Sequence, residues 1–234
     1  MKIKEFTKGI GILFLSIFCF AIIYITLQKL LAPFNLNYNN YWISSIFQLT
    51  VSIISLLIFI LIFKKQLTEE WNIFKANKKE CLKIGAKFWL YGLAVMIISN
   101  NIIIQLAGSI ATNESINQQI IMDLPIFAIF AIVISGPIIE ELSFRAAFKK
   151  AFDNKIAFVI FTSLLFGGAH LLASDMSANW IQLLYLIPYS ALGAAFAISY
   201  QKTNTIIPSI IYHALHNAIS VSLLFILMLL QNLL

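Results

Sequence analysis

The stretch "GILFLSIFCFAIIYITL", residues 11–27, contains no charged side chain and follows Lys2, Lys4 and Lys8. A helix that spans a membrane needs about 20 mostly apolar residues, and the run extends to roughly residues 9–31. It is too long for the apolar region of a secretory signal, and no small-residue cleavage site follows it. We therefore expect a membrane anchor that stays in place.

The composition of the whole chain supports a membrane protein. Of its 234 residues, 60% are hydrophobic and 11% are charged, and the mean hydropathy is +0.89. These fractions lie far outside those of soluble domains. The formal charge is +6, but the lysines stand at the ends of apolar runs and not along one amphipathic face. This pattern is typical of membrane orientation, so we expect a bilayer and no nucleic acid as partner.

Seven apolar segments predict an all-α, polytopic helix bundle that forms one domain over residues 1–234. Three spans are expected within 1–107, and a motif-bearing core within 124–220. Pro137 and Pro208 predict a kink or a helix start, and an eighth, broken or interfacial segment stays open. Residues 64–85 are expected to be the longest polar link. The expected spans are 9–31, 42–63, 86–107, 124–147, 156–173, 180–200 and 206–230.

The distribution of basic residues predicts the orientation. With the N-terminus in the cytoplasm, Lys29 alone of the 16 basic residues lies outside. Cytoplasmic ends carry the excess of Lys and Arg in membrane proteins. The links 108–123 and 173–179 carry neither residue and are expected to face outward, as is the C-terminus. Abundant Ile, Lys, Asn and Phe further indicate a bacterial, multi-pass plasma-membrane protein.

Few ionisable side chains fall within the spans, and each marks a candidate site because charge is costly in a membrane. In "EELSFR" (140–145), Glu141 and Arg145 stand four residues apart and can pair on one helix face. Glu140 leaves the helix in another direction and has no local cation, which favours a raised pKa and a general base. The plainer reading of all three is an ion pair that pins helices together.

The three histidines complete the candidate set. In "FGGAH" (166–170), His170 shares a face with Phe166, and the two glycines allow a neighbouring helix to come close. In "HALHN" (213–217), His213 and Asn217 share a face, with His216 pointing partly the same way. Each motif by itself is equally typical of polar contacts between membrane helices.

The depth of each candidate side chain in the membrane indicates whether these side chains can lie close together. At 1.5 Å per residue, Glu140 lies about 15 Å above Lys150, but His170 lies about 22 Å above Lys155. His170 is therefore the residue hardest to place beside the others.

A glutamate, two histidines and an asparagine below the inner surface can hydrolyse a peptide bond. Glu140 would activate water, a histidine would orient it or protonate the leaving amine, and Asn217 would stabilise the oxyanion. Glu140, His170 and His213 can equally be read as ligands of Zn²⁺ or another divalent metal. No HExxH or GxSxG motif is present, so the cofactor question stays open between a metal and none, and a covalent nucleophile is not expected.

Together the three motifs resemble EExxxR, FxxxH and HxxxN/D of the CPBP family, the CAAX proteases and bacteriocin-processing enzymes also called Abi proteins. The resemblance covers about 124–220 and implies an intramembrane endopeptidase of the CAAX prenyl endopeptidase kind. The resemblance implies that Glu140 is the base that activates water and that His170 and His213 assist it. It implies that Asn217 stabilises the oxyanion. The residues implied to support them are Glu141, Arg145, Phe166 and, at a variable position, His216.

Members of the family are usually called metalloproteases, but a mechanism in which a glutamate activates water without a bound metal is also proposed for the family. The metal dependence of this chain therefore stays open. The substrate would be a peptide or membrane protein. The alternatives are a noncatalytic immunity or scaffold protein that binds a peptide or partner, and a small transporter with a proton relay. Polar groups confined to the second half of the chain disfavour the transporter. The sequence does not indicate an oligomeric state.

Overall fold

The computed structural model describes residues 1–172, 174 and 180–231, and these residues form helices and turns without a strand. The α-helices are α1 (Ile3–Leu31), α2 (Tyr41–Ala76), α3 (Lys78–Ala107), α4 (Thr112–Asp123), α5 (Pro125–Ala128), α6 (Gly136–Phe144), α7 (Lys155–His170), α8 (Leu186–Thr203) and α9 (Ile207–Gln231). Short helices of other types are η1 (Ala32–Phe34), the π-helix η2 (Ile129–Ser135), η3 (Ala146–Phe148) and η4 (Trp180–Tyr185).

The polytopic helical architecture expected from the sequence is confirmed. Within the described residues, six helical segments are long and apolar enough to cross a membrane. The remaining expected span, 156–173, corresponds to α7, an apolar helix of 16 residues. At 1.5 Å per residue it is about 24 Å long, somewhat short of a hydrocarbon core of about 30 Å. A count of seven spans therefore depends on α7.

Two expected links are helical instead. The polar link at 64–85 does not exist, because α2 continues to Ala76 and α3 begins at Lys78. Charged residues are good helix formers and prolong both helices beyond their apolar parts. The link at 108–123 contains α4, which packs against α5. Residues 173 and 175–179 of the other expected outward link lie outside the described residues.

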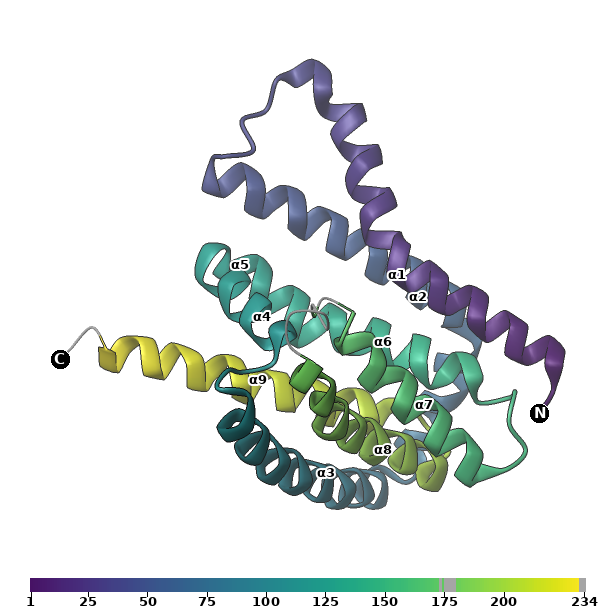
Figure 1. Cartoon of the computed structure of the whole chain (residues 1–234). Helices are drawn as coiled ribbons and strands as arrows, with labels where there is room; N and C mark the ends of the chain where they lie inside the picture. The colour runs from purple at the N-terminus through teal and green to yellow at the C-terminus, as the bar shows by residue number, and fades with distance from the viewer. Residues whose placement is uncertain (173, 175–179, 232–234) are drawn as a thin grey trace.

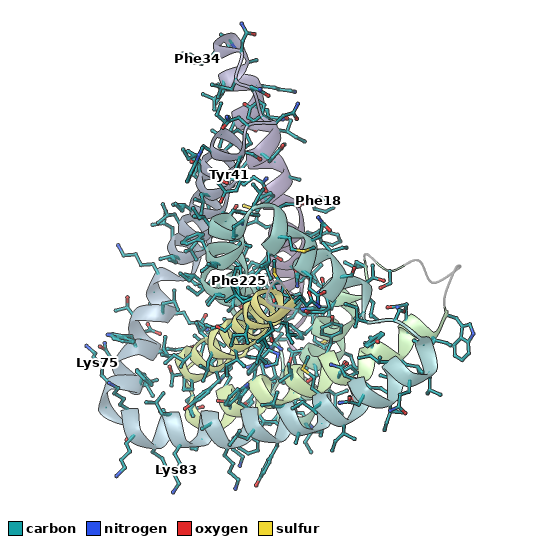
Figure 2. All side chains as sticks on the ribbon, turned by 90° about the vertical axis from the view of Figure 1, so that its left-hand side faces the viewer. Phe18, Phe34, Tyr41, Lys75, Lys83 and Phe225 are labelled. Atoms are coloured by element: carbon teal, nitrogen blue, oxygen red, sulfur yellow. The ribbon has the colours of Figure 1, made fainter. Side chains whose placement is uncertain are left out.

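The helices form a bundle from which one hairpin projects. Figure 1 shows α1 and the first part of α2 as two arms that project beyond the rest of the molecule and are joined by the segment between them, while α3, α7, α8 and α9 lie together below. In Figure 2, Phe34 marks the tip of this hairpin and Tyr41 lies nearer the bundle, while Lys75 and Lys83 extend into the surroundings at the other end. Many large apolar side chains of the long helices are exposed, as expected for helices that face lipid.

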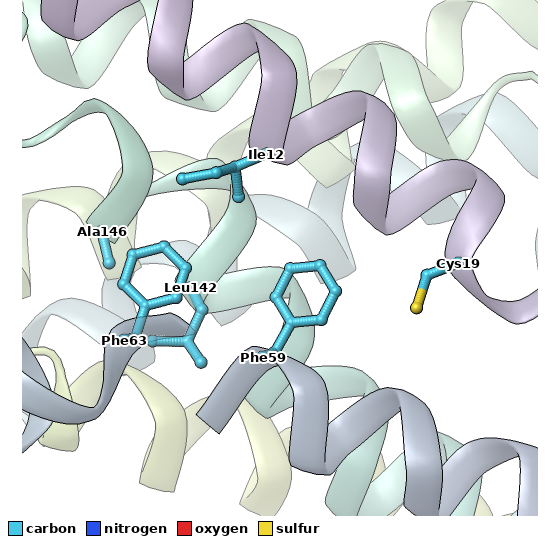
Figure 3. Packing of buried hydrophobic residues seen from close by; sticks show 6 residues of the cluster. All are labelled: Ile12, Cys19, Phe59, Phe63, Leu142 and Ala146. Atoms are coloured by element: carbon cyan, nitrogen blue, oxygen red, sulfur yellow. The ribbon is translucent and has the colours of Figure 1, made fainter. Parts of the chain in front are cut away.

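A hydrophobic cluster fixes α6 between the two arms. Leu142 and Ala146 pack against Ile12 of α1 and against Phe59 and Phe63 of α2 (Figure 3). The side chains of Phe59 and Leu142 are fully buried. The helix that carries the glutamate pair is thereby held on one side by apolar contacts.

The expected irregularity near Pro137 takes the form of a π-helix. Residues 129–135 are wound in this wider form, in which N–H groups bond five residues back, as Gly136 N–H does to Ala131 O. The matching donor for Ile132 O would be residue 137, and proline has no N–H. A Cβ at Gly136 would stand 2.6 Å from Ala131 O, so only glycine fits this turn. The distortion leaves one carbonyl that needs a donor from elsewhere.

Glu70 joins α2 to the start of α9. Its carboxylate accepts hydrogen bonds from the Tyr200 hydroxyl at 2.6 Å and from Ile206 N–H at 2.6 Å. Gln66 Nε2 donates to the same carboxylate at 2.9 Å. A carboxylate at a helix N-terminus also interacts favourably with the helix dipole. Glu70 therefore fixes where α9, the helix of His213 and Asn217, begins.

Replacing Glu70 by Ala should destabilise the protein. The change leaves Tyr200 and Ile206 N–H without their acceptor in a buried setting, at a cost of about 2–4 kcal/mol. Thermal unfolding in detergent should show a clearly lower midpoint than for Glu69→Ala, which removes an exposed neighbouring carboxylate. Equal midpoints for the two variants would contradict this role.

The C-terminus should lie outside the cell if α7 spans the membrane and the N-terminus is cytoplasmic. A reporter active only outside the cytoplasm should then work when fused after Leu234, and should be silent when inserted at Asn77 between α2 and α3. A cytoplasm-specific reporter should give the reverse pattern. A cytoplasmic C-terminus would mean that α7 does not cross or that the charge-based orientation is wrong.

Candidate active site

The two glutamates of α6 occupy different surroundings, as expected from their different directions on the helix. The Glu141 side chain is completely buried, whereas about a third of the Glu140 side chain is exposed. Glu140 lines two cavities, and Glu141 lines neither. The exposed carboxylate can therefore meet a ligand, while the buried one can act only on protein groups.

Glu141 binds two cationic or protonatable partners through one oxygen. Its Oε1 accepts a hydrogen bond from Arg145 Nη1 at 2.9 Å, so the expected pair within α6 is formed. The same oxygen lies 2.9 Å from His213 Nδ1 of α9. A carboxylate that accepts from Nδ1–H holds the proton there and leaves Nε2 unprotonated. Glu141 therefore sets both the tautomer and the orientation of the His213 ring.

Arg145 is enclosed by aromatic rings and backbone. Its guanidinium lies 4.2 Å from the centre of the Phe166 ring, and Nη2 donates to Gly193 O at 3.3 Å. Gly193 permits this approach, because a Cβ there would come within 3.3 Å of Nη2 and 3.1 Å of Ser163. Stacking on an aromatic face and a charge-assisted hydrogen bond offset the desolvation of the buried cation. The expected supporting positions of Arg145 and Phe166 thus form one unit.

His213 stands between the two glutamates. Its Nε2 lies 3.7 Å from Glu140 Oε2, on the other side of the ring from Glu141. The ring is stacked against Phe196 at 4.9 Å between centres and meets the edge of Phe166 at 5.6 Å. The separation of 3.7 Å is too long for a hydrogen bond. Glu140 Oε2 is buried and has no hydrogen-bond partner within the described chain.

His170 lies beside the same glutamate despite the mismatch in depth. It lines both cavities together with Glu140. Helix α6 ends at Phe144, and a 3₁₀ turn and irregular residues follow before α7 begins. Because the helices are not continuous here, the rise of about 1.5 Å per residue does not give the relative height of Glu140 and His170.

The ring of His170 is held by its own helix and by α8. Its Nδ1 is 2.8 Å from Phe166 O, and this carbonyl accepts a hydrogen bond from Nδ1–H, which leaves Nε2 as the acceptor nitrogen. The ring stacks on Tyr189 at 4.5 Å. Close approach of α8 depends on Gly167, where a Cβ would collide with Ser190. The expectation that the glycines of this motif admit a neighbouring helix is confirmed for Gly167.

Asn217 uses the carbonyl that the π-helix leaves unpaired. Its Nδ2 donates to Ile132 O at 2.8 Å, the oxygen whose backbone donor would have been Pro137. An amide nitrogen carries two N–H groups, so one donor remains for a ligand. The Asn217 side chain lines the second cavity, one helical turn from His213. The π-helix and α9 are thus locked together at the candidate site.

Two cavities meet at Glu140 and His170. The first, of about 360 Å³, lies toward α1 and α2 and is bordered by hydroxyl and thiol groups of Ser16, Cys19, Ser52 and Ser55. The second, of about 300 Å³, lies toward α4, α8 and α9 and contains His213, His216 and Asn217. The arrangement gives a chain-like ligand access to Glu140 from two sides.

Helix α4 contributes polar groups that the sequence analysis missed. Asn113, Glu114 and Asn117 line the second cavity, although their segment was expected to be an outward link. Burial raises the pKa of Glu114, and a hydrogen bond from Gln118 opposes this shift. The buried Ile121 anchors α4 in a cluster with Ala128 and Val221. The isoleucines at 116 and 120, one turn apart, were the available signal for a helix here.

The geometry gives no ready metal centre. Among the described residues, no three His, Cys, Asp or Glu side chains come together as a ligand set. Glu140, His170 and His213, the possible ligands named from the sequence, have suitable donor chemistry but do not form a ligand set among the described residues.

Comparison with known proteins agrees with the motifs. Residues 122–219 match the family model described as Type II CAAX prenyl endopeptidase Rce1-like. A protein of Bacillus subtilis (strain 168) named "Putative membrane peptidase YdiL" is 27% identical over 71% of this chain and 67% of its own length. The "UPF0177 protein YxdF" of Lactococcus lactis is 27% identical over 70% of this chain and 88% of its own.

A further relative comes from Mycoplasma capricolum, an "Uncharacterized protein" that is 28% identical over 93% of this chain and 68% of its own length. No solved structure matches the chain. The matched segment 122–219 contains all three motifs and every residue of the glutamate, histidine and asparagine constellation. On this evidence the chain is a multi-pass membrane protein whose residues 122–219 are similar to the Rce1-like family of type II CAAX prenyl endopeptidases.

Proposed function

We propose that this protein is an intramembrane endopeptidase in which Glu140 activates water for attack on a peptide bond. The match of residues 122–219 to the family model supports a membrane protease of the CAAX type. The observation that carries the catalytic assignment is the partly exposed carboxylate of Glu140, which lines both cavities and lies 3.7 Å from His213 Nε2 through its Oε2. A carboxylate that faces a cavity beside an acceptor nitrogen is a suitable place for one water molecule.

The proposed reaction uses this chain's own residues for each proton. Glu140 takes one proton from the water, and the hydroxide oxygen bonds to the carbonyl carbon of the substrate. The remaining N–H of Asn217 donates to the negative oxygen that forms. The carbon–nitrogen bond then breaks, and the proton held by Glu140 passes to the leaving amine, directly or through His213 Nε2. The products are a carboxylate and an amine.

Supporting roles follow from the contacts. Glu141, braced by Arg145, keeps His213 in one tautomer, as carboxylates do for histidines in other hydrolases. His170 Nε2 provides a second acceptor for the water at the junction of the cavities. His216 lines the cavity with Asn217 and would influence the site without touching the reacting atoms.

The substrate class follows from the location. A cavity formed between membrane helices admits a peptide or a segment of a membrane protein. The family description names prenylated CAAX tails, and bacteriocin precursors are a further candidate class. Peptide libraries with and without a prenyl group would decide between them.

Glu140→Gln should abolish cleavage by the purified protein, a loss of at least about 100-fold, because the amide cannot accept the proton of water. Its thermal unfolding midpoint should stay close to that of the unchanged protein. The matched control is Glu69→Gln, the same change at an exposed position of α2. Full activity of Glu140→Gln would show that the base is elsewhere. A function in the host that survives the combined loss of Glu140 and His213 would instead favour a noncatalytic binding protein.

Arg145→Ala should lower the amount of folded protein, because it leaves the buried Glu141 charge without its main partner. Breaking a buried pair typically costs about 3–5 kcal/mol. Thermal unfolding of detergent-purified protein measures the effect, with Lys150→Ala as an exposed control. Unchanged stability of Arg145→Ala would contradict the bracing role.

Metal dependence is tested separately by cleavage before and after treatment with a chelator. The mechanism above predicts unchanged activity. A loss that added Zn²⁺ restores would show that a metal performs the step assigned to Glu140.

A further inference from the structure

A third cavity lies at the other end of α7 from His170. It has a volume of about 590 Å³ and is formed by the start of α7 and the end of α8. Its lining residues are Lys155, Ile156, Val159, Ile160, Ile198, Gln201, Lys202 and Asn204. None of them lines either cavity at Glu140.

The polar and apolar parts of this groove are separated along the membrane normal. Lys155 of α7 is followed one helical turn later by Val159, and Lys202 of α8 is preceded one turn earlier by Ile198. Because both lysines stand at the same end of the bundle, both aliphatic side chains lie about 6 Å deeper. The groove therefore has two ammonium groups at its rim and a hydrocarbon wall below them.

The cationic rim carries uncompensated charge. Within the described residues, neither Lys155 nor Lys202 forms an ion pair, and the nearby Asp153 is paired with Lys2 at 3.0 Å. Lys202 makes only a weak contact with the Phe88 ring, at 5.8 Å. Burial lowers the pKa of the neighbouring Lys149 to about 8; Glu70 opposes this shift, and the charge of Lys155 adds to it.

The apolar wall faces the surroundings of the protein. Ile156 is 71% exposed and Ile160 is 55% exposed. A side chain of this kind on a membrane helix meets lipid tails rather than water. Gln201 and Asn204 add amide donors beside the lysines.

From this arrangement we propose that the groove between α7 and α8 binds an anionic phospholipid. The phosphate of the headgroup lies between Lys155 and Lys202 with hydrogen bonds from the amides, and one acyl chain runs along Val159, Ile160 and Ile198. Basic pockets between membrane helices recognise acidic headgroups by the same combination of charge and depth. The site is independent of the proposed peptidase activity and braces the two helices that carry His170 and Tyr189.

The test is lipid binding by the full-length protein in detergent, measured by native mass spectrometry. Phosphatidylglycerol and phosphatidylcholine with the same acyl chains are compared, with inorganic phosphate as competitor. We expect retention of phosphatidylglycerol in preference to phosphatidylcholine. The double variant Lys155→Gln/Lys202→Gln should bind phosphatidylglycerol roughly ten- to thirtyfold more weakly, since each lysine near a headgroup contributes about 1 kcal/mol.

Two further variants keep the test specific. Lys78→Gln/Lys79→Gln removes the same charge from exposed positions at the start of α3, outside the groove, and should bind like the unchanged protein. Ile160→Trp fills the exposed wall without altering charge and should also weaken binding. An equal loss of phosphatidylglycerol binding in Lys78→Gln/Lys79→Gln would show that the lipid is attracted by the overall positive charge at this end of the bundle and not by the groove. Equal retention of phosphatidylcholine, or full competition by millimolar phosphate, would likewise overturn the proposal.

Discussion

The candidate site depends on one buried carboxylate oxygen, Glu141 Oε1, which accepts from both Arg145 and His213. A charge in this position is tolerated because its partners are close and well oriented, and because Arg145 is itself stacked on Phe166. The arrangement joins α6 to α9 through His213 and to α7 and α8 through Arg145. Glu140, the preceding residue, keeps one oxygen that accepts no hydrogen bond within the described part of the chain. In the proposed mechanism, structural and chemical roles are thereby divided between adjacent glutamates.

A second constraint is the π-helix that precedes them. It widens the turn before Gly136 and, together with Pro137, leaves the Ile132 carbonyl for Asn217. Ser135 at its end is also bonded to Ser52 of α2, at 2.8 Å between hydroxyls. Distorted helical turns of this type occur frequently at functional sites. Here the distortion positions α6, and with it both glutamates, relative to α2 and α9.

Much of the fold could be predicted because apolar runs and lysines at their ends are strong signals in membrane proteins. The pair between Glu141 and Arg145 followed from spacing on one helix, and the close approach at Gly167 followed from residue size. The contact between Glu141 and His213 could not be predicted, since it joins positions 72 residues apart. The helical continuation of α2, the cavity-lining role of α4 and the anchoring of α9 by Glu70 were missed for a related reason. Polar segments were interpreted as links, although Glu70 binds partners that are distant in the sequence and α4 packs through Ile121 against Val221.

The central claim is that side chains from α6, α7 and α9 converge on space for one water molecule beside Glu140. The most direct measurement is an experimental structure of the protein in a lipid nanodisc, resolved well enough to place side chains. The account predicts Glu140 Oε2 within about 4 Å of His213 Nε2, or joined to it by one water, with His170 at the same cavity. A Glu140 carboxylate turned into lipid, or more than ~10 Å from both imidazoles, would contradict it.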